Sequence, residues 1–179
     1  MRSQTALTVR PRRPADLPQL GKALTRVHQV DGYPVEGVTD PERWLQPPNE
    51  IAGWTALLDH QPVGHISLTN PTPSDAAAQV WTTKTRGHLG DIAVVVRLFV
   101  DPDRRGHGAG RELMRAAHQH ATTLGKRLVF DVMLKDEHAI RLYENLGCDR
   151  LGLITHHHSD GLEEPAAVYV APDHLPAAR

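Results

Sequence analysis

The chain has 179 residues, of which 40% are hydrophobic and 23% charged, a composition typical of one globular domain. Its formal net charge is −1 and aromatic residues make up only 4%, which argues against nucleic acid as a partner. No apolar run approaches the roughly 20 residues of a membrane span, and none near the N-terminus has the length of a signal peptide. These properties favour small-molecule chemistry in a soluble protein.

The first half of the chain alternates between strand-like and helix-like patterns. Apolar residues recur every three or four positions after Pro14, a residue that can open a helix. The predicted elements are a strand at Leu7–Arg10, a helix from Pro14 through Val27, a short helix from Asp40 that includes Trp44 and Leu45, and a hairpin of Trp54–Leu58 with Val63–Leu68.

The second half carries the strongest strand pattern, because Ile92–Val100 is an almost unbroken β-branched and apolar run that stops at Asp101-Pro102. The other predicted elements are a loop at Pro71–Ala78, a short strand at Gln79–Thr83, a loop at Arg86–Gly90, a helix whose apolar stripe includes Leu113, Met114, Ala117, Ala121 and Leu124 and which ends at Gly125, a strand at Leu128–Met133, a helix at Asp136–Leu146, and strands at Leu151–Thr155 and Ala167–Val170. This order predicts a single α+β (mixed α/β) domain over residues 1–179, with helices on the faces of a mixed sheet.

A glycine-rich turn, Arg105-Gly106-His107-Gly108-Ala109-Gly110, separates this apolar strand from the next helix. A helix N-terminus leaves about four backbone amides without partners, and glycines let a phosphate approach them closely. The turn lacks the Gly-Lys-Ser/Thr end of a nucleotide triphosphatase loop, and its spacing and late position disfavour a dinucleotide fold. We therefore expect the turn to bind a pyrophosphate; a tight turn with no ligand, or a phosphate-binding α/β domain of another kind, is the alternative.

Two segments resemble the signatures of the GNAT superfamily of acyl-CoA-dependent N-acyltransferases. The first is Leu98-Phe99-Val100-Asp101-Pro102 followed by Arg105-x-x-Gly108-x-Gly110, and the second is Ala139 through Gly147. The resemblance implies a GNAT fold with a central, mostly antiparallel sheet flanked by helices. It also implies an N-acetyltransferase that uses acetyl-CoA as co-substrate, requires no metal, and acts on a primary amine in a ternary complex.

The resemblance also implies roles for individual residues. Backbone groups of Leu98, Phe99 and Val100 are expected to bind the pantetheine, and the segment Arg105, Gly106, His107, Gly108, Ala109 and Gly110 the pyrophosphate. Asp136 stands where many family members have an asparagine that contacts the pantetheine arm; its alternative role is a helix N-cap. Tyr143 matches the tyrosine that protonates the departing thiolate, with a core tyrosine as the alternative.

The general base and the acceptor are left open by the sequence. Many family members place a glutamate on the fourth strand, but none lies between Ile92 and Val100; His65, His88, Asp91 and a water chain are the candidates. The acceptor is a small-molecule amine or a protein amine, and because dimers are frequent in such families a homodimer is also open. A non-catalytic acyl-CoA-binding sensor of the same fold is the alternative function.

The remaining residues of chemical interest favour structural roles. Cys148 is the only cysteine, which excludes an intrachain disulfide and favours the reducing cytoplasm. It replaces an aromatic residue common in the family and is expected to be a small buried residue. Three adjacent histidines, His156 to His158, do not indicate a metal site, because neighbours on a strand point to opposite faces.

Overall fold

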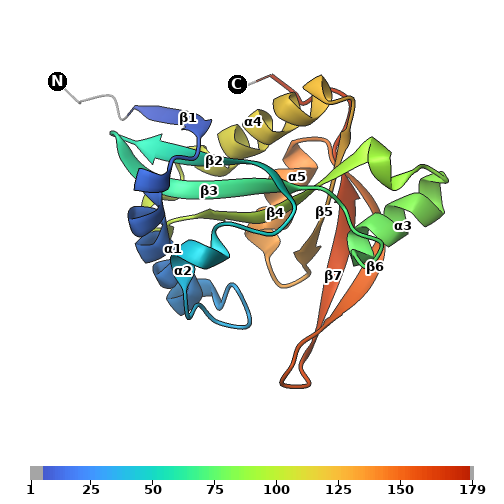
Figure 1. The fold of residues 1–179 in the computed structure, drawn as a ribbon, viewed down its shortest axis with the longest axis horizontal. Coiled ribbons are helices and arrows are strands. Elements are labelled where there is room, and N and C mark those ends of the chain that lie inside the picture. The colour runs from blue at the N-terminus through green and yellow to red at the C-terminus, as the bar shows by residue number, and fades with distance from the viewer. Residues whose placement is uncertain (1–5, 178–179) are drawn as a thin grey trace. The chain divides into compact units, whose positions relative to one another are not determined.

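The structure, a computed structural model, describes residues 6–177. Within these residues seven strands form one mixed sheet in the order β1-β2-β3-β4-β5-β7-β6, with helices beside it (Figure 1). The strands are β1 (Leu7–Pro11), β2 (Glu50–Leu58), β3 (Gln61–Thr69), β4 (Ile92–Val100), β5 (Arg127–Met133), β6 (Asp149–His157) and β7 (Glu163–Val170). The helices are α1 (Leu17–Asp31), α2 (Pro41–Trp44), α3 (Ala76–Thr85), α4 (Ala109–Thr123) and α5 (Glu137–Asn145), and short 3-10 turns cover Pro14–Asp16, Leu89–Asp91 and Pro102–Arg104.

The sheet is mostly antiparallel, as the family resemblance implies. The pairs β1–β2, β2–β3, β5–β7 and β6–β7 are antiparallel, and β4–β5 is parallel. The chain divides into two compact units. One contains residues 1–69 and 96–117, and the other contains residues 70–95 and 118–179, so the boundary between them falls inside β4 and inside α4. The predicted α+β architecture, a mixed and mostly antiparallel sheet flanked by helices, is confirmed, and the prediction of a single domain stays a prediction.

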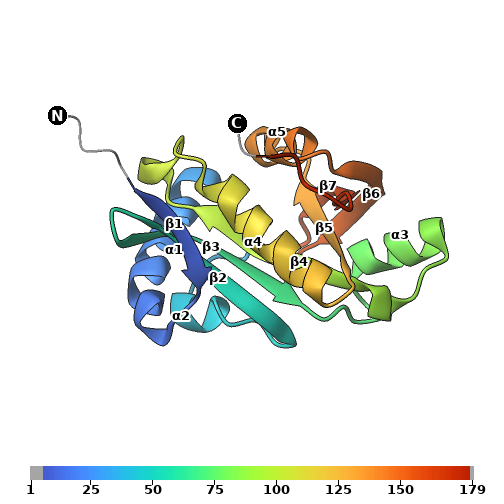
Figure 2. The same cartoon turned by 90° about the horizontal axis from the view of Figure 1, so that it is seen from above.

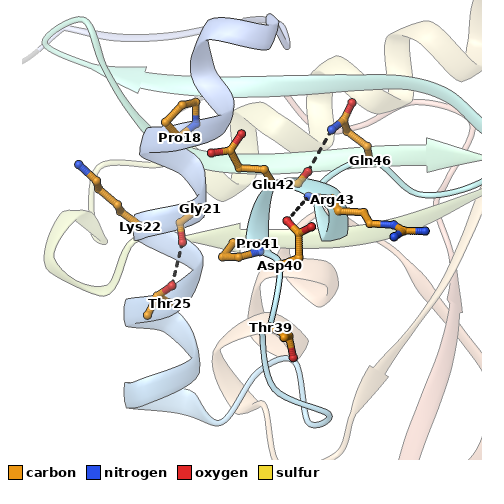
Figure 3. Close-up of a pocket in the computed structure, with 10 residues that line it drawn as sticks. All are labelled: Pro18, Gly21, Lys22, Thr25, Thr39, Asp40, Pro41, Glu42, Arg43 and Gln46. Carbon is orange, nitrogen blue, oxygen red and sulfur yellow. Dashed lines mark hydrogen bonds between the residues drawn. The ribbon is translucent and has the colours of Figure 1, made fainter.

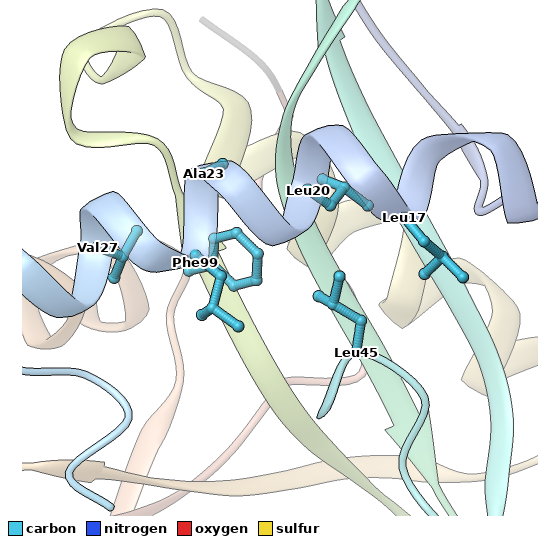
Figure 4. Close-up of a cluster of buried hydrophobic side chains, with 7 residues drawn as sticks. Leu17, Leu20, Ala23, Val27, Leu45 and Phe99 are labelled. Carbon is cyan, nitrogen blue, oxygen red and sulfur yellow. The ribbon is translucent and has the colours of Figure 1, made fainter. Parts of the chain in front are cut away.

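In the first unit, α1 and α2 cover one face of the strands and the start of α4 covers the other (Figures 1 and 2). Alternation along β3 sets these two faces, since Gly64 lies under Leu113 of α4 while the ring of His65 stacks on Phe99, 5.7 Å between centroids. The cluster beneath α1, drawn in Figure 4, contains Leu17, Leu20, Ala23, Leu24, Val27, Leu45 and Phe99. The spacing of its α1 members, three or four residues apart, is the helical pattern expected from the sequence.

The start of α1 is fixed by a buried carboxylate. Asp16 accepts two hydrogen bonds of 2.7 Å from the Arg10 guanidinium and one of 2.8 Å from the Arg13 amide. Thr55 on β2 donates a fourth, at 2.9 Å. Burial pushes the pKa of Asp16 upward, but the hydrogen bonds from Arg10, Arg13 and Thr55 outweigh it and lower this pKa to about 2. The carboxylate therefore ties α1 to β1 and β2.

In the second unit, α3 replaces the strand predicted at Gln79–Thr83, so that prediction was wrong. The helix starts within the predicted loop, at Ala76, and buries Ala77, Ala78 and Trp81 against β5, β6 and β7. Alanine has the highest helix propensity, and the spacing of these three buried residues is helical rather than alternating.

The remaining predicted helices and strands are confirmed within one to four residues at their ends. One expected core residue is misplaced, because Leu124 follows α4 and is 46% exposed. None of the helices within residues 6–177 combines the length and the hydropathy that a bilayer crossing demands.

Candidate active site

The glycine-rich turn, Arg105–Gly110, follows the end of β4 and includes the first two residues of α4. Pro102–Arg104 forms one 3-10 turn, after which Gly106 and Gly108 adopt φ values of +85° and +84°. These values lie in the left-handed region, which glycine enters without the steric penalty of a Cβ atom. Successive backbone N–H groups in a turn that enters the left-handed region form concavities that bind anions.

The amides of this turn are available to a ligand. Among residues 6–177, the backbone N–H groups of Gly106, His107, Gly108, Ala109 and Gly110 donate to no protein acceptor. The first hydrogen bond of α4 runs from the Glu112 amide to the Gly108 carbonyl, at 3.1 Å. Residues 103–108 are exposed. Five adjacent donors at the positive end of a helix dipole form a site suited to a phosphate group.

Two ion pairs to α1 fix the chain at the start of the turn. Asp101 is buried, and its carboxylate pairs with the Arg26 guanidinium and accepts from the Asp103 amide at 3.2 Å. Burial pushes the pKa of Asp101 upward, but the bonds from Arg26 and Asp103 lower it overall. Arg105 pairs with Asp31 at the end of α1 and reaches the Val100 carbonyl at 3.3 Å. The side chain of Arg105 is thus held in place at the start of the turn.

The segment expected to bind the pantetheine follows an irregularity in β4. Arg97 has φ +58°, an uncommon value for a residue other than glycine. The parallel ladder pairs only Ile92, Ala93 and Val94 with β5, so the backbone of Leu98, Phe99 and Val100 takes no part in that ladder. Phe99 points into the core under α1, whereas Leu98 and Val100 are partly exposed.

A buried polar cluster lies beside this irregularity and was not found from the sequence. We call Arg12, Glu50, His65, Ser67 and Arg97 the β4 cluster. Arg12 and Glu50 form a two-bond ion pair of 2.8 and 2.7 Å, and the Ser67 hydroxyl donates to Glu50 at 2.6 Å. The cluster needs a glycine at position 53, because a Cβ atom on Gly53 would lie 2.6 Å from the Arg12 guanidinium.

His65 is a structural member of this cluster rather than an accessible base. Arg12 Nη1 lies 3.0 Å from its Nε2, and because a guanidinium only donates, Nε2 accepts. The hydrogen is therefore on Nδ1, which donates to the Arg97 carbonyl at 2.9 Å. The side chain is fully buried, and burial lowers the pKa of His65 to about 4. Both nitrogens of a neutral ring are occupied.

The other two residues named as bases cap each other at the start of β4. His88 and Asp91 are exposed, and the Asp91 carboxylate accepts from the His88 amide at 3.0 Å. The structure therefore shows a local capping role for Asp91.

In the second unit, Tyr143 lies on the buried face of α5. Its ring centroid is 4.4 Å from that of Phe130 and 6.0 Å from that of Tyr169, and the residue is 6% exposed. Asp136 is the N-cap of α5, since its carboxylate accepts from the Ala139 amide at 3.0 Å. The N-cap role weighed for Asp136 is confirmed, and a coenzyme contact by this residue stays a prediction.

The residues expected to be structural have structural partners. Cys148 is buried, and desolvation raises the pKa of its thiol to about 12, so a thiolate is disfavoured at neutral pH. His156 pairs with Asp131 at 2.5 Å and His157 with Glu163 at 3.1 Å. In the described part of the chain, the His, Cys, Asp and Glu side chains form no group of three suited to a metal ion.

The pocket drawn in Figure 3 lies between α1 and α2 and has a volume of about 780 Å³. Its walls mix two cations, Lys22 and Arg43, with Glu42 and Asp40, and Asp40 already accepts a hydrogen bond from the Arg43 amide. A lining of balanced charge does not by itself select a class of ligand. The pocket shares no residue with the glycine-rich turn.

The sequence of the chain is similar to that of a known protein. The chain is 28% identical over 106 residues to the uncharacterized N-acetyltransferase MJ1207 of Methanocaldococcus jannaschii, a match of 59% of this chain and 42% of that protein. The chain therefore matches less than half the length of this relative.

Two solved structures share the fold. One is yncA of Salmonella typhimurium with its cofactor acetyl-CoA, at a TM-score of 0.72 and 16% identity over 97% of both chains. The other is the ribosomal-protein-alanine N-acetyltransferase of Brucella melitensis, at a TM-score of 0.70 and 19% identity over 91% of this chain and 98% of that one. The model of the acetyltransferase (GNAT) family matches residues 20–148, most of the chain. This chain therefore belongs to the acetyltransferase (GNAT) family.

Proposed function

We propose that this protein transfers the acetyl group of acetyl-CoA to an amine by direct attack in a ternary complex. The observation that carries the proposal is the row of five amides, from Gly106 to Gly110 at the start of α4, that have no acceptor within the described residues. Each charge-assisted hydrogen bond to a phosphate contributes about 1.5–3 kcal/mol, so three or four of them hold a pyrophosphate without a metal ion. Membership of the family and the acetyl-CoA in the yncA structure support the choice of coenzyme.

The coenzyme lies, in this proposal, along the end of β4 and the turn. Leu98, Phe99 and Val100 offer backbone groups to the pantetheine, because β5 does not pair with them. The side chain of Arg105 lies beside the proposed pyrophosphate site, where Asp31 and the Val100 carbonyl hold it in place and Asp31 balances its charge. The side chain of His107 is exposed at the same turn.

Transfer requires that the amine lose a proton and the thiolate gain one. The pKa of an amine like that of lysine lies about three units above pH 7, so nearly all of the amine is protonated. A proton must therefore leave before the nitrogen attacks the thioester carbonyl. With both nitrogens of His65 occupied, His88, Asp91 and a water chain are the remaining routes. Tyr143 is proposed to donate the proton that converts the departing thiolate to the thiol.

The alternative is a sensor of the same fold that binds acyl-CoA without turnover. Its support is the absence of a glutamate from Ile92 to Val100 and the use of Asp136 as an N-cap. Calorimetric titration of the protein with acetyl-CoA, followed by thiol release against a panel of amines, separates the two functions. Binding with acceptor-dependent thiol release is expected; binding without release from any amine would favour the sensor, and no binding would contradict the coenzyme assignment.

Replacing Tyr143 by phenylalanine is expected to lower kcat by about 10–100-fold, because a positioned acid contributes on the order of 10²-fold. The affinity for acetyl-CoA should change less than about twofold, since the ring and its packing on Phe130 are kept. Steady-state thiol release and calorimetry measure the two quantities.

Tyr169→Phe is the matched control for this variant. Its hydroxyl is buried and has no hydrogen-bond partner within the described residues, so its loss should leave kcat unchanged and not reduce stability. Equal kcat values for Tyr143→Phe and wild type would remove the acid role of Tyr143.

A further inference from the structure

Arg97 is the member of the β4 cluster whose charge has no partner of opposite sign. Arg12 and Glu50 neutralise each other in their two-bond pair, and His65 is neutral. Among residues 6–177, no carboxylate lies within ion-pair distance of the Arg97 guanidinium. The cluster therefore carries one net positive charge, and it resides on Arg97.

The Arg97 guanidinium is held in place, and some of its N–H groups remain available to a ligand. Nη1 donates to the Trp44 carbonyl, and the guanidinium carbon lies 4.8 Å from the centroid of the Trp44 ring. Tyr33 packs edge-on against the Trp44 ring, 5.8 Å between ring centroids. No other hydrogen bond of this side chain occurs within the described residues, so Nε and Nη2 are available.

The surroundings of the Arg97 guanidinium favour the binding of an anionic ligand. Arg97 is half-buried, and this desolvation lowers its pKa from the usual value. A partly desolvated cation without a counterion is costly, and the planar fork of a guanidinium matches the two oxygens of a carboxylate. Stacking on Trp44 orients the plane of the fork.

The position of Arg97 relates this charge to the reaction. It directly precedes Leu98 in the chain, with about 3.8 Å between their Cα atoms, and Leu98 begins the segment proposed to bind the pantetheine and the thioester. An amine that attacks the thioester carbonyl therefore comes close to the origin of the Arg97 side chain.

We propose that Arg97 binds a carboxylate of the acceptor, so that the acceptor is a small amine that also carries a carboxylate group, such as a free amino acid. The inference rests on the proposed acetyl transfer and narrows its acceptor class. The competing class of acceptor is the amine at the N-terminus of a protein. The residue that bears this amine has no carboxylate unless its side chain is acidic.

The test compares free amino acids with the corresponding amino-acid amides, which keep the amine and lose the negative charge. With acetyl-CoA saturating, kcat/KM of the wild-type protein is expected to be at least about tenfold higher for the acids, the equivalent of one charge-assisted hydrogen bond. Arg97→Gln should abolish this preference and leave acetyl-CoA affinity unchanged. Arg97→Lys, which keeps the charge but not the fork, should retain part of it.

Arg43→Gln is the control, because it removes the same charge from an exposed residue next to Trp44; it should keep the preference. Equal rates for acids and amides in the wild type, or equal losses for both in Arg97→Gln, would overturn the proposal. If no amine releases thiol although acetyl-CoA binds, the proposed acetyl transfer fails. Titration of the same acid and amide pairs into the CoA-loaded protein then still decides whether Arg97 selects a carboxylate, and no difference in affinity would refute it.

Discussion

Gly108→Glu is expected to weaken acetyl-CoA binding by at least about 100-fold. Gly108 has φ +84°, a region that disfavours any residue with a Cβ atom by about 1–2 kcal/mol. The new carboxylate would also stand among the free amides of the turn, where it would repel a pyrophosphate and accept its hydrogen bonds. Loss of only two such bonds, at about 1.5–3 kcal/mol each, accounts for the expected change.

Calorimetric titration with acetyl-CoA measures this effect, and Gly161→Glu is the matched control. Gly161 has φ +82° and no atom within 4 Å of a Cβ placed on it, so the backbone strain and the added charge are equivalent. Gly161 lies in the turn between β6 and β7, outside the glycine-rich turn. We expect Gly161→Glu to bind normally. An affinity of Gly108→Glu within about threefold of wild type would show that the pyrophosphate binds elsewhere.

His65→Leu is expected to destabilise the protein by about 2–3 kcal/mol at pH 7.5. Leucine keeps an apolar contact with Phe99 but removes the donor to the Arg97 carbonyl and the acceptor beside Arg12. Buried polar groups that lose a partner cost about 1–3 kcal/mol each, and Arg12 retains its bonds to Glu50 and to the Leu45 carbonyl. Urea unfolding measures the change.

The same substitution should remove part of the acid sensitivity of the fold. The pKa of His65 falls from 6.5 to about 4 on folding, so between these values the unfolded state binds more protons and stability decreases as pH falls. Between pH 7.5 and pH 5 the wild type should lose about 2 kcal/mol more than His65→Leu, at about 1.36 kcal/mol per pKa unit. His138→Leu, on the exposed side of α5, is the control, and parallel pH profiles for wild type and His65→Leu would contradict the assignment.

The sequence predicted best what is encoded by neighbouring residues. The strand Ile92–Val100, the turn after it and the N-cap of α5 each depend on a few consecutive side chains, and each was found with nearly correct bounds. The helix α3 was missed because Gln79–Thr83 alone alternates weakly. Its helical character depends on Ala76–Ala78 before it and on the burial of Trp81 against β7.

What the sequence by itself determined is therefore the family resemblance and the glycine-rich turn that we propose binds the coenzyme, because all the amides of such a turn come from one short segment whose glycines set its backbone. Only the tertiary structure decided the β4 cluster, since Arg12, Glu50, His65 and Arg97 come from four separate segments of the chain. It also decided their charge states. Burial makes His65 neutral and pairing cancels Glu50 against Arg12, which leaves Arg97 as the cation that we propose binds the acceptor.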